Sequence, residues 1–143
     1  MLLKFLHWLE SGEKTADDLT TFCLHRIAES DAEIRAWVEV APQPPLDSGP
    51  LDGIPFGAKD IFETDGLLTQ YGSPLYAGRR GTRDAAVVAD LRYYGAVLLG
   101  KTHTTAFASF DPAPTRNPRL PGHTPGGSSA GSEIGRASCR ERV

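Results

Sequence analysis

The chain has 143 residues, of which 40% are hydrophobic and 23% charged, and its formal net charge is −3. That length allows one domain with a hydrophobic core, while the small negative charge gives no electrostatic reason to expect a nucleic-acid partner. No window approaches the roughly 18 consecutive apolar residues that a membrane-spanning helix requires. Cys23 and Cys139 show neither metal-ligand spacing nor a disulfide framework, so we expect a protein of the reducing cytoplasm.

The N-terminal part is predicted to be helical. Residues 2–10 are mostly apolar and form a short helix that ends near Gly12, a residue type that commonly follows a helix C-terminus. Thr15 is the expected N-cap of a second helix, because Asp18 follows it at the spacing of a capping box. Further along, residues 34–40 alternate between apolar and polar side chains, which predicts an extended segment.

The middle of the chain is predicted to contain a strand, a helix and a second strand. Residues 51–62 form the first strand, and the short apolar run 96–100, bounded by glycines, is typical of a buried strand. Between them, Asp84 is the expected N-cap of a helix over residues 85–94. The side chains of this helix that we expect to face the core are Val87, Val88 and Leu91.

This order of elements predicts an α/β fold in which a mixed sheet is flanked by helices. A strand–helix–strand unit with a right-handed crossover brings its two strands together in parallel. Lys59 and Lys101 lie near the ends of the two predicted strands. We therefore expect them to lie near the same edge of the sheet.

Two segments carry residues suited to acyl transfer. Residues 124–132 (TPGGSSAGS) place serine hydroxyls between glycines, close to free backbone N–H groups, although such a run alone is typical of turns and linkers. Residues 53–60 (GIPFGAKD) place Lys59 after a mostly apolar stretch. Burial disfavours the ammonium form and can lower the lysine pKa of ~10.4 by several units. Lys59 is therefore a candidate general base for a serine nucleophile, with Lys101 as the competing candidate.

Four blocks of sequence, in this order, resemble the amidase signature family: residues 51–60, 96–105, 115–118 and 126–129. The resemblance implies that residues 1–132 are the N-terminal part of an amidase domain, so that the α/β fold of this chain is incomplete. It also implies hydrolysis of a carboxamide through a Ser–Ser–Lys relay and an acyl-enzyme, with no metal and no organic cofactor. The implied partner is a small-molecule amide substrate, with neither nucleic acid nor membrane, and no particular oligomeric state is predicted.

The resemblance also implies roles for individual residues. Lys59 is the implied general base, and Ser128 is the implied relay serine, reached through a cis peptide bond. Gly126 and Gly127 support the site by relieving crowding beside that bond. Ser129 either supports the site by hydrogen bonding or is the N-cap residue of a helix. The acylated serine is implied to lie further downstream, in a second glycine-rich segment that this chain does not contain.

Residues 133–143 depart from the family pattern. They are rich in charged residues and show no stripe of apolar side chains. We expect this tail to mark a truncation or an artefact of cloning or sequence assembly. We also expect no amidase activity from residues 1–143 alone.

Other interpretations of the serine run belong to different classes of protein. Residues 127–131 also spell the G-x-S-x-G nucleophile elbow, but the proline-rich segment before them cannot be the central strand that an elbow requires. Residues 126–132 match G-x-x-x-x-G, with Ser132 in place of the P-loop lysine, so a phosphate-binding loop stays open as an alternative. A non-catalytic fragment is the other alternative. The four histidines are scattered, which argues against a metal site.

Overall fold

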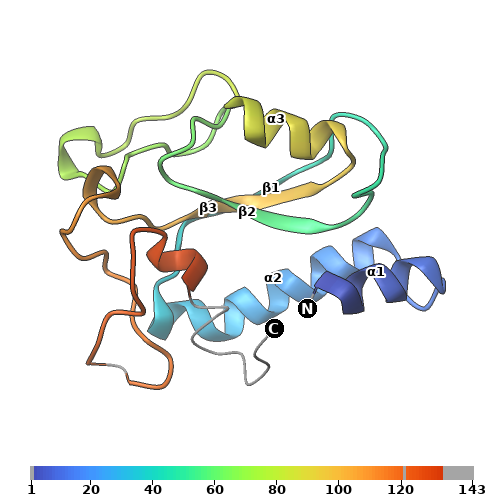
Figure 1. Cartoon of the computed structure of the whole chain (residues 1–143), viewed down its shortest axis with the longest axis horizontal. Coiled ribbons are helices and arrows are strands. Elements are labelled where there is room, and N and C mark those ends of the chain that lie inside the picture. The colour runs from blue at the N-terminus through green and yellow to red at the C-terminus, as the bar shows by residue number, and fades with distance from the viewer. Residues whose placement is uncertain (1, 121, 134–143) are drawn as a thin grey trace.

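The computed structural model describes residues 2–120 and 122–133. A small sheet lies between two helical layers, with α3 (Ala86–Tyr93) over one face and with α1 (Leu2–Glu10) and α2 (Ala16–Ile34) over the other (Figure 1). This is the predicted α/β fold, in which helices flank a mixed sheet. Within the described ranges, no helix combines the length and the apolar character needed to cross a membrane.

The sheet has three strands in the order β1-β3-β2. The central strand is β3 (Val97–Thr102), and all of its residues except the first are buried, as its apolar run predicted. It pairs in antiparallel fashion with β1 (Trp37–Gln43) and in parallel with β2 (Pro55–Lys59). Because α3 joins β2 to β3 along the chain, the strand–helix–strand unit is formed as expected. Lys59 and Thr102 are register partners where the two parallel strands end.

Two apolar clusters hold β2 in place. Beneath α3, Ala58 of β2 packs with Val88 and Leu98. Just before β2, Ile54 packs against Leu19 of α2 and against side chains of α1. Fully burying one such aliphatic side chain contributes roughly 1.5–3 kcal/mol to folding. The strand is therefore anchored near its start and again at the residue before Lys59.

The start of α2 confirms the predicted capping box. The Thr15 hydroxyl accepts a hydrogen bond from Asp18 N at 3.2 Å, and the Asp18 carboxylate accepts one from Thr15 N at 2.8 Å. The box thereby pairs two backbone N–H groups that the helix start would otherwise leave free. The first helix is also confirmed, and Gly12 beyond its end has a φ of +70°.

Two predictions for α3 are wrong. The N-cap is Ala85, which makes no capping bond with its side chain. The Asp84 carboxylate instead accepts a hydrogen bond from Arg92 Nη1 at 2.7 Å, because this buried guanidinium requires a charged partner. Val87 was expected in the core and is 46% exposed, whereas Val88 is the valine that α3 turns inward.

The predicted boundaries of two extended segments also differ from the structure. The strand expected over residues 51–62 is shorter, because a turn closed by Ile54 N on the Leu51 carbonyl at 2.9 Å precedes β2. The segment expected over residues 34–40 becomes extended only at the start of β1, since α2 continues to its first residue. The tail predicted over residues 133–143 lies outside the described residues, apart from its first residue.

Replacing Thr15 with alanine tests the capping box. The variant loses the side-chain acceptor for Asp18 N, so we expect the free energy of unfolding to fall by about 1 kcal/mol. Thr21→Ala is the matched control, because Thr21 is exposed within the same helix and alanine has the higher helix propensity. Urea denaturation followed by circular dichroism measures both variants. Equal losses of stability in the two would contradict the capping role.

Candidate active site

Lys59 and Ser128, which are 69 positions apart, meet at the C-terminal end of β2. Lys59 Nζ donates a hydrogen bond to Ser128 Oγ at 2.7 Å, and both residues are half-buried. Lys59 is the last residue of β2, while Ser128 lies in the loop before residues 130–133, which are helical. The structure thus brings together the two segments that the sequence singled out separately.

The amine of Lys59 lies in an environment that favours its neutral form. Burial lowers the pKa of Lys59 below its ordinary value of 10.5, because it removes hydration that stabilises the ammonium more than the neutral amine. Among the residues that the structure describes, no carboxylate forms an ion pair with Lys59. A lysine with a lowered pKa and a serine hydroxyl in contact is an arrangement suited to proton transfer.

The backbone of Ser128 is held by hydrogen bonds from the segment that follows β3. Its carbonyl oxygen accepts one from Thr105 N at 3.0 Å and another from Thr104 Oγ1 at 3.1 Å. The peptide bond between Gly127 and Ser128 is cis, the configuration that the resemblance implied at this serine. Gly126 has a φ of +114°, a conformation that side chains other than glycine rarely adopt.

The second serine of the pair has a different position. The Ser129 carbonyl accepts hydrogen bonds from Ser132 N at 2.9 Å and from Glu133 N at 3.0 Å, at the start of the helical residues 130–133. Within the described part of the chain, no side-chain hydrogen bond joins Ser129 to Lys59 or to Ser128. This position agrees with the helix-start alternative for Ser129.

Lys101, the competing candidate, lies on the other face of the sheet. Its register partner is Ala58, one residue before Lys59, and successive strand residues point to opposite faces. The Lys101 amine is fully buried and donates hydrogen bonds to the Phe62 carbonyl at 2.6 Å and to Thr69 Oγ1 at 2.9 Å. Its side chain therefore binds the loop after β2 and is directed away from Ser128.

A second feature of Lys101 is the electrostatic cost of its position. Burial lowers the pKa of Lys101 to about 8, although Asp60 Oδ1, at 3.8 Å from Nζ, opposes that shift. The Asp60 carboxylate also accepts backbone N–H bonds from Gln70 at 2.9 Å and from Gly72 at 3.1 Å. Lys101 and Asp60 together tie this loop to the end of the sheet beside Lys59.

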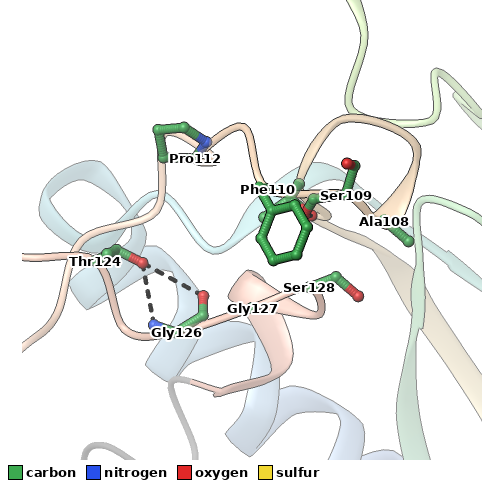
Figure 2. A pocket seen from close by; sticks show the side chains of 9 residues that line it. Ala108, Ser109, Phe110, Pro112, Thr124, Gly126, Gly127 and Ser128 are labelled. Atoms are coloured by element: carbon green, nitrogen blue, oxygen red, sulfur yellow. Dashed lines mark hydrogen bonds between the residues drawn. The ribbon is translucent and has the colours of Figure 1, made fainter.

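An open cavity of about 430 Å³ lies beside Ser128. Figure 2 shows Thr124 and Gly126 at one end of the cavity lining and Ala108 and Ser128 at the other, with the Phe110 ring between them. No residue that lines the cavity carries a charged side chain, so the cavity is suited to a neutral group. The complete lining is Thr105, Ala108, Ser109, Phe110, Pro112, Thr124, Gly126, Gly127 and Ser128.

The wall of this cavity is a strained turn that the sequence did not reveal. Phe107 and Ala108 both have positive φ, at 48° and 55°, which is costly for residues other than glycine. Phe107 N donates to the Tyr71 carbonyl at 2.8 Å, and Thr105 Oγ1 donates to the Ser109 carbonyl at 2.6 Å. The bond from Phe107 links this turn to a distant segment, whereas the bond from Thr105 closes the turn itself. The local sequence offered one signal for this turn, which is the position of Thr105 at the end of a family-like block. Within the described ranges, no group of three or more His, Cys, Asp or Glu side chains is arranged to hold a metal ion.

Comparison with known proteins gives consistent matches. A sequence model of the family described as Amidase matches residues 18–133. A glutamyl-tRNA(Gln) amidotransferase subunit from Chloroflexus aurantiacus is 38% identical over 144 residues, and the match covers 87% of this chain and 30% of that protein.

Solved structures of related enzymes resemble the described fold. The native peptide amidase from Stenotrophomonas maltophilia superposes with a TM-score of 0.79 and 31% identity. The superposition covers 92% of this chain and 32% of the peptide amidase chain. The corresponding glutamyl-tRNA(Gln) amidotransferase subunit from Thermotoga maritima superposes with a TM-score of 0.74 and 30% identity, covering 86% of this chain and 29% of its own. The chain therefore spans about a third of the length of these relatives.

The buried Lys101 makes the stability of the fold depend on pH. Its pKa is about 8 in the folded protein and close to the ordinary 10.5 in the unfolded chain. Between these values the unfolded chain binds more protons, so the folded state gains stability as the pH rises. We expect the free energy of unfolding to increase by about 3 kcal/mol from pH 8 to 10.5, measured by urea denaturation.

Two substitutions separate this effect from other titrations. Lys101→Met removes the buried amine, so the free energy of unfolding of this variant should not increase between pH 8 and 10.5. Lys14→Met removes an exposed lysine, and its free energy of unfolding should still show the increase. An equal increase in Lys101→Met and in the unsubstituted protein would contradict the account of Lys101.

Proposed function

This chain belongs to the amidase family, and from that premise we propose that Lys59 and Ser128 serve the hydrolysis of a carboxamide to a carboxylate and ammonia or an amine. The observation that carries the proposal is the 2.7 Å contact between a lysine of lowered pKa and a serine hydroxyl. The names of the relatives supply the reaction class, because they include an amidotransferase component and a peptide amidase. In the same proposal, residues 1–132 are the N-terminal part of the amidase domain.

The proposed first step is a proton relay. The neutral Lys59 amine accepts the hydroxyl proton of Ser128 while Ser128 Oγ accepts the proton of a second serine, whose oxygen attacks the amide carbonyl carbon. The resemblance assigns this second serine to a glycine-rich segment beyond residues 1–143, and the proposal keeps that assignment. The products of the step are a Lys59 ammonium and a tetrahedral intermediate with a negatively charged oxygen.

The remaining steps return the proton. When the carbon–nitrogen bond breaks, Lys59 delivers its proton through Ser128 to the departing nitrogen, and the second serine remains acylated. Water then gives up a proton through the same two residues and attacks the acyl carbon, which releases the carboxylate and the free serine. Each proton removed in one step is replaced in the next, so the relay needs no metal and no organic cofactor to complete the cycle.

The proposed substrate is a small-molecule amide that enters the cavity beside Ser128. The uncharged lining suits the neutral carboxamide group rather than an anion. The alternative of a phosphate-binding loop has less support, since several N–H groups of the loop already donate within the protein. These are the N–H groups of Gly126, Gly131 and Ser132.

A hybrid enzyme tests the role of Lys59. Residues 1–133 of this chain replace the matching third of the Stenotrophomonas maltophilia peptide amidase, and amide hydrolysis is measured. We expect Lys59→Ala to lower kcat by about 10²–10⁴-fold, because the general base is lost. Lys59→Arg should be impaired as severely, since a guanidinium stays charged. Lys14→Ala removes an exposed lysine and should leave kcat unchanged. Wild-type turnover by a folded Lys59→Ala hybrid would refute the proposal.

Trapping with hydroxylamine tests where the acylated serine lies. We expect the purified 143-residue chain to form hydroxamate from an amide no faster than its Ser128→Ala variant, because the proposed nucleophile is elsewhere. Hydroxamate formation that requires Ser128 in this chain alone would overturn the assignment of the nucleophile to a downstream segment.

A further inference from the structure

We infer that Thr104 is a positioning residue whose hydroxyl holds the backbone of Ser128 so that Ser128 Oγ stays in contact with Lys59 Nζ. The catalytic consequence of this inference rests on the proposed function. The geometric claim is that the Thr104 hydroxyl keeps Ser128 in contact with Lys59. This claim does not depend on the proposed function and is measured separately.

The first support is the position of the Thr104 hydroxyl. Thr104 lies two residues beyond the end of β3 and is 1% exposed. Its Oγ1 is 3.1 Å from the Ser128 carbonyl oxygen and 3.0 Å from the Thr105 carbonyl oxygen, so one hydroxyl proton is shared between two acceptors. A buried hydroxyl is costly unless it is hydrogen-bonded, and a valine would fill nearly the same space. The hydroxyl is therefore best explained by the bond that it makes.

The second support is the character of the loop that carries Ser128. Gly126 and Gly127 precede this serine and are exposed, so no side-chain packing from them restrains the loop. On this side of Ser128, hydrogen bonds supply the restraint that side-chain packing does not. The Ser128 carbonyl accepts two of them, from Thr105 N at 3.0 Å and from Thr104 Oγ1, while its hydroxyl contacts Lys59.

These bonds connect the sheet to the relay. The strand β3 ends at Thr102, where Lys59 is its register partner, and Thr104 continues the same segment to the Ser128 carbonyl. A serine side chain has only one rotatable bond between its backbone and its oxygen. A displacement of the Ser128 backbone therefore also displaces Oγ relative to the Lys59 amine.

The geometric claim is tested by NMR on the 143-residue chain. The readout is the nuclear Overhauser effect between the ε protons of Lys59 and the β protons of Ser128. We expect Thr104→Val to remove this signal and Thr104→Ser, which keeps a hydroxyl, to retain it. Thr64→Val is the matched control, because Thr64 is also fully buried but its hydroxyl donates to the Phe62 carbonyl at 3.1 Å.

Two results of the NMR experiment would contradict the positioning role of Thr104. An unchanged signal in folded Thr104→Val, or equal losses in Thr104→Val and Thr64→Val, would overturn the inference. If Thr104→Val does not fold, Thr104→Ala is measured in its place, because it removes the hydroxyl without adding a methyl group.

The catalytic consequence is tested in the hybrid enzyme. We expect Thr104→Val to lower kcat about 10–100-fold with KM unchanged, as misplacement of a catalytic group does, and Thr104→Ser to restore kcat. Unchanged kcat would overturn the positioning role. A hybrid that is inactive with Thr104 intact would count against the proposed function instead, and the NMR measurement would still decide the geometric claim.

Discussion

The hydrogen bond between Lys59 Nζ and Ser128 Oγ joins two segments that are far apart in sequence, and it depends on the rest of the described fold. Lys59 is positioned by β2, which is anchored by parallel pairing with β3 and by apolar contacts on both sides of the sheet. Ser128 is positioned by the segment that leaves β3, through Thr104 and Thr105. The central strand β3 therefore positions both Lys59 and Ser128. Its near-complete burial explains how a small sheet can hold a site at its end.

The same parallel register assigns the two lysines to different surroundings. Lys101 is offset from Lys59 by one residue, so it lies on the opposite face of the sheet. There it is fully buried, and its amine binds a carbonyl, a hydroxyl and, more distantly, the Asp60 carboxylate. Lys59 is half-buried and contacts a serine hydroxyl. Burial lowers the pKa of both lysines, but only the amine of Lys59 is in contact with the serine of the proposed relay.

The features predictable from sequence were those set by neighbouring residues. The capping box at Thr15 and the buried strand β3 follow from short-range spacing and apolar composition. Asp84 failed as a helix cap because its carboxylate accepts hydrogen bonds from Arg92, eight positions away, and from Asp65 N, 19 positions away. Thr104 was missed for a related reason, since its bond to Ser128 crosses 24 positions. Contacts of this range leave no periodic pattern in a single sequence.

The most direct test of the account is the protonation equilibrium of Lys59 itself. A ¹³C NMR titration of the lysine ε carbons, with the Lys59 signal identified from a Lys59→Arg variant, gives the pKa of its amine in the folded chain. The account predicts a pKa below the ordinary value of 10.5, caused by loss of hydration at the end of β2. A pKa at or above 10.5 would contradict it, because the surroundings of Lys59 would then not disfavour the ammonium form.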